Sequence, residues 1–269
     1  MRQVRETVYG VVPEWEYLPD GWSTKRDKIK GWHDPTIVET QKSKWVEFLR
    51  VAHGTGPLGI AFEAPSIETN DYYAHHILMA YAYVLALAAR QKTRISLLDW
   101  GGGLGHYFIF SRMLVPDLDI DYWCKDLPSL CEAGQRVLPE LRFVEDESVI
   151  VGRQYDLVIA SGSLQYLKDW KSVAQLLASV ASPYLYITRL PFVRRDKSFV
   201  ALQRVHRYGY DTEVMGWVFS RDEFIDAMVS LGLELVREFA FDKHPMIKNV
   251  QEQAQIQGFL FRSKMASHP

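Results

Sequence analysis

The sequence predicts an α/β fold in which helices cover both faces of a mainly parallel sheet. Apolar runs of strand length alternate with segments of helical character from about residue 90 to residue 262, as in doubly wound sheets. The first of these strands, residues 94–98, leads into a glycine-rich turn, and a helix is expected directly after it. Strand, glycine turn and helix in this order usually build a binding site at the carboxyl end of a parallel strand.

Length and composition are those of an ordinary globular domain with additions. The chain has 269 residues, of which 48% are hydrophobic and 24% are charged, and its formal net charge is -2. A net charge this small gives no general attraction to nucleic acid or to an anionic membrane. The longest apolar run, residues 77–89, is too short to cross a bilayer. We therefore expect neither a nucleic-acid partner nor insertion into a membrane.

Cysteine usage favours a cytoplasmic protein with reduced thiols. Cys124 and Cys131 are the only two cysteines, and a single pair spaced in this way supplies neither a disulfide framework nor a zinc site. No secretory signal peptide is visible in residues 1–10. We expect no metal, and a homo-oligomer is compatible with the sequence.

Two regions are predicted, an N-terminal extension over residues 1–65 and a main domain over residues 66–269. Tryptophans lie in or near the predicted turns of the extension, and a helix is expected over about residues 40–52. A second, largely apolar helix is expected from about residue 70 to residue 91. We interpret the extension as a cover of the core and a lid over the site; support of the fold or of a dimer is the alternative.

The glycine turn carries the pattern Asp-x-Gly-Gly-Gly-x-Gly over residues 99–105. A dinucleotide fingerprint would read G-x-G-x-x-G/A, and its last position here falls on His106. Glycine allows positive φ and close approach of a ligand, and the next helix offers free N–H groups at its start. Four residues of this segment are candidate binding residues: Asp99, Gly101, Gly103 and Gly105.

A second strand, residues 118–124, leads into Lys125-Asp126-Leu127-Pro128. In nucleoside-binding α/β folds, an acid at the end of the second strand accepts hydrogen bonds from the ribose hydroxyls. Asp126 is the candidate here. The alternative is that it only caps the helix that starts at Pro128.

These segments resemble the class I S-adenosylmethionine (SAM)-dependent methyltransferases. Residues 99–105 resemble motif I of that family, Asp126-Leu127-Pro128 resembles the ribose segment of small-molecule O-methyltransferases, and residues 155–167 are similar to the fourth strand and the turn after it. The resemblance implies a Rossmann-like, seven-stranded sheet that ends in a helix, a strand and a reversed strand. It also implies SAM as cofactor and S-adenosylhomocysteine (SAH) as product.

The same resemblance implies a set of cofactor-binding residues. An acid after the third strand, residues 141–144, commonly meets the adenine amino group in this family, and among three adjacent acids we choose Asp146. The full set implied is Asp99, Gly101, Gly103, Gly105, Asp126, Leu127, Asp146, Ser161, Gly162 and Tyr166.

Catalytic residues are harder to assign. Gln165 stands where plant-type O-methyltransferases have their base histidine, and glutamine cannot accept a proton. His206 lies in a polar stretch over residues 189–211, and His75 lies in the first turn of the long apolar helix. A reference pKa of about 6.5 suits either for general-base work, so both are candidates, with a structural role as the alternative.

The polar stretch over residues 189–211 is expected to be a long connection above the carboxyl ends of the strands. Its five arginines could bind a phosphorylated or carboxylated acceptor, or the stretch could be a solvated loop. Beyond it, Ser220 and Glu223 predict a capping box at the start of the last helix.

The chain is also similar to a family of methyltransferases of about this length that is associated with surface-polysaccharide genes. The long helix before the glycine strand, residues 99–105 and residues 199–203 carry this narrower resemblance. It implies methyl transfer to a small-molecule acceptor, on a hydroxyl of a sugar or polysaccharide precursor. The alternatives are a catalytically silent SAM-binding partner protein and an NAD-dependent oxidoreductase. A hydrolase has least support, because no G-x-S-x-G elbow is present.

Overall fold

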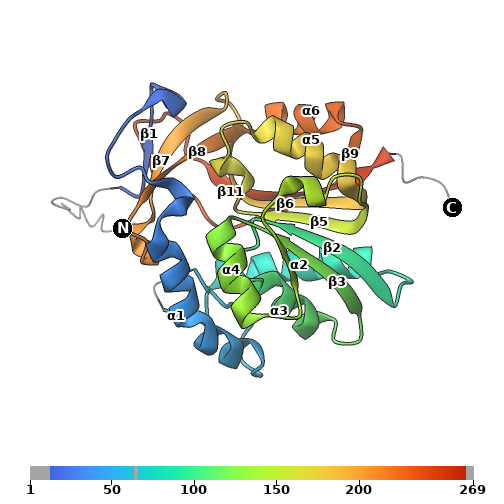
Figure 1. Cartoon of the computed structure of the whole chain (residues 1–269). Helices are drawn as coiled ribbons and strands as arrows, with labels where there is room; N and C mark the ends of the chain where they lie inside the picture. The colour runs from blue at the N-terminus through green and yellow to red at the C-terminus, as the bar shows by residue number, and fades with distance from the viewer. Residues whose placement is uncertain (1–12, 64–65, 265–269) are drawn as a thin grey trace, which may run out of the picture.

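The computed structural model describes residues 13–63 and 66–264. Residues 1–12, 64 and 65 of the predicted extension lie outside the described residues, as do residues 265–269. The described chain forms a sheet of eleven strands with α-helices on both faces (Figure 1). None of its helices combines the length and the apolar character that crossing a membrane would require.

Seven strands form the main body of the sheet. Their order across it is β4 (Arg142–Val144), β3 (Asp119–Lys125), β2 (Arg94–Trp100), β5 (Tyr155–Ser161), β6 (Ala181–Val193), β11 (Gln255–Ser263) and β9 (Leu233–Ala240). The first five run parallel, and β11 runs antiparallel to both of its neighbours.

Four further strands make the sheet larger than the seven-stranded sheet that the sequence predicts. They continue from β6 in the order β8 (Glu213–Ser220), β7 (Phe199–Arg204), β1 (Trp15–Tyr17) and β10 (Ile247–Lys248). β5 pairs with β6 as far as Thr188, whereas β8 pairs with β6 only at Phe192 and Val193. One edge of β6 therefore has two partner strands in succession, β5 along its first part and β8 along its last residues. The place where these two partners diverge is called the fork of β6 below.

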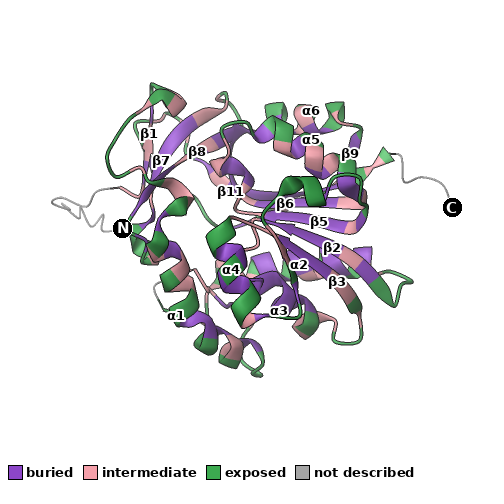
Figure 2. Ribbon diagram, in the orientation of Figure 1, coloured by how far each residue is buried: buried purple, intermediate pink, exposed green. Residues whose placement is uncertain are grey.

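Helices cover the sheet in two layers. Four lie on one face, α1 (Pro35–Ala52), α2 (Tyr72–Ala88), α3 (His106–Leu114) and α4 (Pro128–Val137); two lie on the other, α5 (Trp170–Val180) and α6 (Arg221–Ser230). Side chains alternate between the faces along a strand, so Leu97 joins the first core and Leu98 the second. The central strands are accordingly buried on both sides (Figure 2).

The stretch over residues 189–211 is not the long loop that the sequence analysis expects. β6 continues to Val193 because Leu190 and Phe192 are buried, and the chain returns as β7. An apolar run within this polar stretch, Val200 to Leu202, is also buried. It supplies the strand that pairs antiparallel with β8.

The capping box predicted at the start of α6 does not form. Ser220 is the N-cap residue, but its side chain makes no capping hydrogen bond. Glu223 instead accepts hydrogen bonds from the backbone N–H and the hydroxyl of Ser198, at 3.1 and 2.7 Å. Glu223 therefore joins the start of β7 to α6, a tertiary contact that local sequence does not encode.

Phe224 of α6 tests the packing of that helix on the sheet. Its ring is fully buried against Trp170, Phe219 and Phe259. Truncation of such a ring leaves a cavity, so we expect Phe224→Ala to lower the free energy of unfolding by about 3–5 kcal/mol. In the matched control Val229→Ala, on the exposed side of the same helix, the change should stay within about 0.5 kcal/mol. Urea unfolding measures both, and equal losses would contradict the packing.

Candidate functional site

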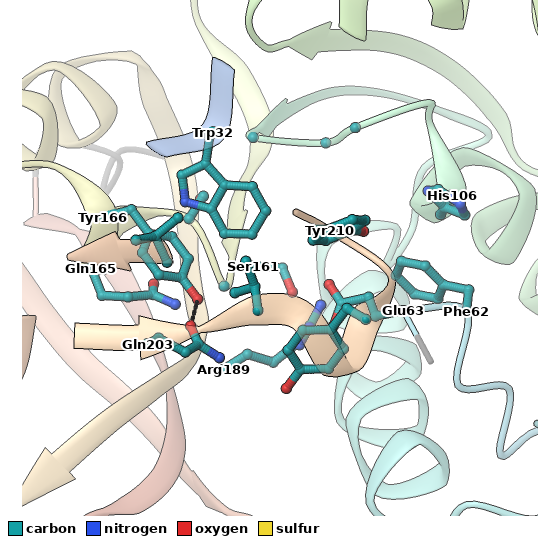
Figure 3. A pocket seen from close by; sticks show the side chains of 18 of the residues that line it. Trp32, Phe62, Glu63, His106, Ser161, Gln165, Tyr166, Arg189, Gln203 and Tyr210 are labelled. Atoms are coloured by element: carbon teal, nitrogen blue, oxygen red, sulfur yellow. Dashed lines mark hydrogen bonds and ion pairs between the residues drawn. The ribbon is translucent and has the colours of Figure 1, made fainter. Parts of the chain in front are cut away.

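A cavity of about 800 Å³ opens where the carboxyl ends of β2, β3 and β5 meet the fork of β6. Its volume lies in the range of roughly 300–1,000 Å³ that is typical of small-molecule sites. The glycine turn and Asp126 line one end, and aromatic, amide and charged side chains line the other. Figure 3 shows this second half, where Trp32, Tyr166, Tyr210 and Arg189 surround a common space.

Both oxygens of Asp126 accept hydrogen bonds from backbone N–H groups, and one of these groups belongs to the glycine turn. Its Oδ2 accepts a hydrogen bond from the Gly103 N–H at 2.7 Å, and its Oδ1 accepts from the Leu127 N–H at 2.7 Å. Burial raises the pKa of Asp126, and these two N–H donors act against that rise. The carboxylate lines the cavity, so each oxygen keeps acceptor capacity for a ligand hydroxyl.

The glycine turn leaves room for a ligand because it carries no side chains. Gly101 and Gly103 have φ of 75° and 60°, and both line the cavity. A Cβ on Gly101 would overlap Ser163, and one on Gly102 would overlap Asp99. Residues of this kind fit a nucleoside that lies directly against the backbone.

Asp99 lies beneath the turn rather than in the cavity. Its side chain is fully buried, its Oδ2 accepts from the Tyr122 hydroxyl at 2.6 Å, and its Oδ1 has no partner in the described chain. Burial raises the pKa of Asp99 to about 7, against the effect of the Tyr122 hydrogen bond. Its place indicates support of the turn, not contact with a ligand.

The other predicted cofactor residues divide into two groups. Leu127, Ser161, Gly162 and Tyr166 line the cavity together with Asp126. Gly105 packs instead toward Leu138 and Leu141. Asp146 is exposed, and its Oδ1 accepts from the Ser148 N–H at 2.8 Å as the cap of a short helical turn. The neighbouring acid Glu147 lines the cavity in its place.

Neither histidine chosen as a candidate base lines the cavity. His206 is exposed, and its Nδ1 lies 3.0 Å from the Tyr210 carbonyl oxygen. His75 is half-buried on α2, where its ring faces that of His76 at 6.2 Å. The geometry therefore gives neither residue access to a ligand in this cavity.

His106 lines the cavity, although the sequence predicts no binding role for it. In the sequence it only breaks the dinucleotide fingerprint. Its ring stacks on Phe62 at 4.2 Å and lies among aromatic rings of α1. Burial, together with the positive charges of Lys44 and Arg189, lowers the pKa of His106 to about 3. His106 is therefore a neutral wall of the cavity.

Several lining residues come from segments far apart in the sequence, which is why sequence reasoning missed them. Trp32 of the N-terminal segment meets Tyr166 at 4.8 Å and Tyr210 at 6.1 Å between ring centroids. Tyr166 donates a hydrogen bond to Gln203 Oε1 at 2.7 Å, and Gln203 Nε2 donates to Glu14 at 2.9 Å. This chain of contacts fixes the Tyr166 ring at the wall of the cavity.

Two of the side chains that line this half of the cavity form an ion pair. Arg189 Nη2 of β6 pairs with Glu63 Oε2, which belongs to the segment between α1 and α2 (Figure 3). Arg189 is one of the five arginines of the polar stretch over residues 189–211, for which the sequence predicts no individual role. No pattern in the sequence connects it with Glu63, 126 residues away.

The raised pKa of Asp99 predicts a pH dependence of stability. The folded chain keeps the Asp99 proton up to about pH 7, whereas an unfolded chain releases it near 3.8. The folded state thus binds more protons in this range, and this contribution to stability is lost as pH rises from about 4 through 7. We expect the free energy of unfolding of the natural chain, minus that of Asp99→Asn, to fall over this range. Urea titrations at several pH values measure it, and a constant difference would contradict the assignment.

Comparisons with known proteins relate the fold to methyltransferases. No family model matches the sequence. No curated protein matches it. A protein proposed to be a sarcosine dimethylglycine methyltransferase, from Galdieria sulphuraria, aligns with 83% of this chain and 98% of its own, with a TM-score of 0.53 and 15% identity. The magnesium protoporphyrin IX methyltransferase of Synechocystis PCC 6803 with bound SAH aligns over 85% and 98%, with a TM-score of 0.50 and 13% identity. At these identities the likeness shows that the chain has the fold of these enzymes.

Proposed function

We propose that this chain is a SAM-dependent methyltransferase that moves a methyl group to a small-molecule acceptor. One observation carries the proposal: the Asp126 carboxylate is held by two backbone N–H donors, one of them in the glycine turn, and both turn and carboxylate line a large cavity. The fold supports the proposal, because both solved structures described above are named as methyltransferases and one of them holds bound SAH.

Each end of the cavity has its own task in this proposal. Asp126 would accept hydrogen bonds from the two ribose hydroxyls, while Gly101 and Gly103 let the nucleoside approach the backbone. Glu147, rather than Asp146, is then the acid that can meet the adenine amino group, because only Glu147 lines the cavity. Ser161 and Gly162 would lie beside the donor's amino-acid end.

SAM supplies a methyl group on a sulfonium, already activated for transfer. The chain has to align the acceptor with that methyl group and exclude water, and such orientation can account for roughly 7–11 kcal/mol of a barrier. The aromatic walls Trp32, Tyr166 and Tyr210 provide rigid surfaces for this alignment. Because Trp32, Phe62 and Glu63 belong to the first 65 residues, we propose that this extension covers the site.

For the acceptor we propose a hydroxyl of a sugar or of a sugar-linked precursor. Aromatic faces next to amide and carboxylate groups suit a polyhydroxylated ring, and the acceptor half of the cavity combines Trp32 and Tyr210 with Gln165, Gln203 and Glu14. Gln165 is buried, and its Oε1 has no hydrogen-bond partner in the described chain. Because that oxygen is itself buried, a ligand would reach it only if the Gln165 side chain turned toward the cavity.

Calorimetric titration with SAH tests the proposal. We expect the natural chain to bind SAH, and Asp126→Ala to weaken that binding by about tenfold or more, because a charge-assisted hydrogen-bond acceptor for the ribose is lost. The matched control is Asp146→Ala, whose carboxylate is exposed outside the cavity; its affinity should stay unchanged. Equal effects of the two variants would remove Asp126 from the site, and binding of NADH in place of SAH would favour the oxidoreductase.

Turnover separates an enzyme from a silent SAM-binding protein. We expect SAH to accumulate from SAM when neutral sugars or uronic acids are supplied as acceptors, and expect Asp126→Ala to slow this at limiting SAM. SAH binding without any such turnover would favour the silent partner.

A further inference from the structure

Arg189 projects from a strand in an unusual way. β11 pairs with Thr188 and with Leu190 of β6, and its register shifts between these two pairs, so Arg189 is the bulged residue. Its φ is 63°, in the left-handed region that non-glycine residues rarely adopt. Bulges of this kind re-aim a side chain, and here Arg189 lines the cavity at the fork of β6.

The guanidinium of Arg189 lies over the end of β5. A Cβ on Gly162 would lie 3.5 Å from Arg189 Cζ, at van der Waals distance, so the guanidinium lies next to Gly162. The Arg189 side chain is 14% exposed. Burial acts to lower the pKa of Arg189, but Glu63, Tyr73 and Tyr107 raise it well above its ordinary value, so the charge stays in place.

Glu63 accepts from only one of the nitrogen atoms of the Arg189 guanidinium. It pairs through a single oxygen, Oε2, with Nη2, whereas a guanidinium carries five N–H donors in a fork that matches a carboxylate or phosphate. Glu63 is 45% exposed and comes from a connecting segment rather than from the sheet. Lys44 of α1 is a second positive neighbour of Glu63. Glu63 therefore keeps a counter-charge when it leaves Arg189.

We propose that Arg189 is the receptor for an anionic group, a carboxylate or a phosphate, of a ligand bound in this cavity, and that Glu63 holds the place of that group until the ligand arrives. The bulge and the left-handed backbone at Arg189 direct one fixed positive charge into the cavity, next to Gly162. A carboxylate of the chain already binds there, which shows the chemistry that the position accepts. This inference rests on the proposed function for the identity of the ligands.

The anionic group has two sources. One is the carboxylate of the donor's amino-acid end: Asp126 follows β3 and Gly162 follows β5, two strand spacings or roughly 10 Å apart across the sheet, and the methionine portion of SAM extends from the ribose. The other source is an acidic group on the acceptor, such as a uronic acid or a sugar phosphate. The two sources make different demands on SAH binding.

Calorimetry with SAH and with 5′-methylthioadenosine, which lacks the amino-acid portion, distinguishes the donor. If Arg189 binds the donor carboxylate, Arg189→Gln weakens SAH binding by about tenfold or more and leaves methylthioadenosine binding unchanged. If it binds the acceptor, both affinities stay unchanged. In that case acetate or inorganic phosphate raises the Tm of the SAH complex over chloride at equal ionic strength, and Arg189→Gln abolishes this rise.

Glu63→Gln separates a receptor from a merely structural ion pair. Removal of the competing carboxylate should tighten binding of the same anion that Arg189→Gln loses, so the two variants act in opposite directions. A structural pair predicts the same direction for both. The matched control is the partly buried pair Arg221 and Glu238 on α6 and β9; Arg221→Gln should change none of these affinities.

Each result decides the inference. Unchanged SAH affinity together with no Arg189-dependent anion effect would overturn it, as would parallel loss in Arg189→Gln and Glu63→Gln for both nucleosides. If the natural chain does not bind SAH but acetate or phosphate still stabilises it through Arg189, the proposed function fails while the receptor stands.

Discussion

The bond between the Asp126 carboxylate and the N–H of Gly103 is the contact on which the site depends. It joins the end of β3 to the turn that follows β2, the two strands whose carboxyl ends form one side of the cavity. With the second bond from Leu127, it fixes the position of an acceptor group before any ligand is present. Because the carboxylate is already ordered, ligand binding does not have to bear the entropy cost of ordering it. Asp99, buried below with a raised pKa, packs so closely under the turn that no side chain fits at Gly102.

The fork of β6 explains the other half of the cavity. β11 stays paired with one edge of β6, but on the other edge β5 ends at Ser161 opposite Thr188, and β8 begins to pair only at Phe192. Arg189 lies in the interval between these two partners. β7 brings Gln203 to the cavity, and the connection from β7 to β8 brings Tyr210. The enlarged sheet therefore has a consequence for binding as well as for packing.

Sequence reasoning reached the parts of the fold and the site that are encoded locally. The strand over residues 94–98, the glycine turn and Asp126 lie close together in the chain, and the structure brings the turn and Asp126 to one cavity. The resemblance points to one of three adjacent acids, and Asp146 is the wrong one. The short helical turn that Asp146 caps places Glu147 at the cavity, and no sequence pattern indicates this. His75 and His206 are candidates because imidazole can act as a general base, but neither side chain lines the cavity.

The contacts that sequence reasoning did not reach are long-range. Glu63 and Arg189 meet only because a connecting segment passes a bulge in β6, and Trp32 meets Tyr166 only because an N-terminal turn folds over the fork. Polar residues in the stretch over residues 189–211 favour a loop, but those over residues 194–198 form the connection from β6 to β7, whereas Arg189 and Gln203 line the cavity from within strands. The apolar run from Val200 to Leu202 was the signal for β7.

A crystal structure of the chain grown with SAH tests the central claim most directly. The account predicts nucleoside density against Gly101 and Gly103, with both ribose hydroxyls within hydrogen-bonding distance of the Asp126 carboxylate. Density for SAH at any other place, or a cavity that stays without nucleoside at saturating SAH, would contradict it.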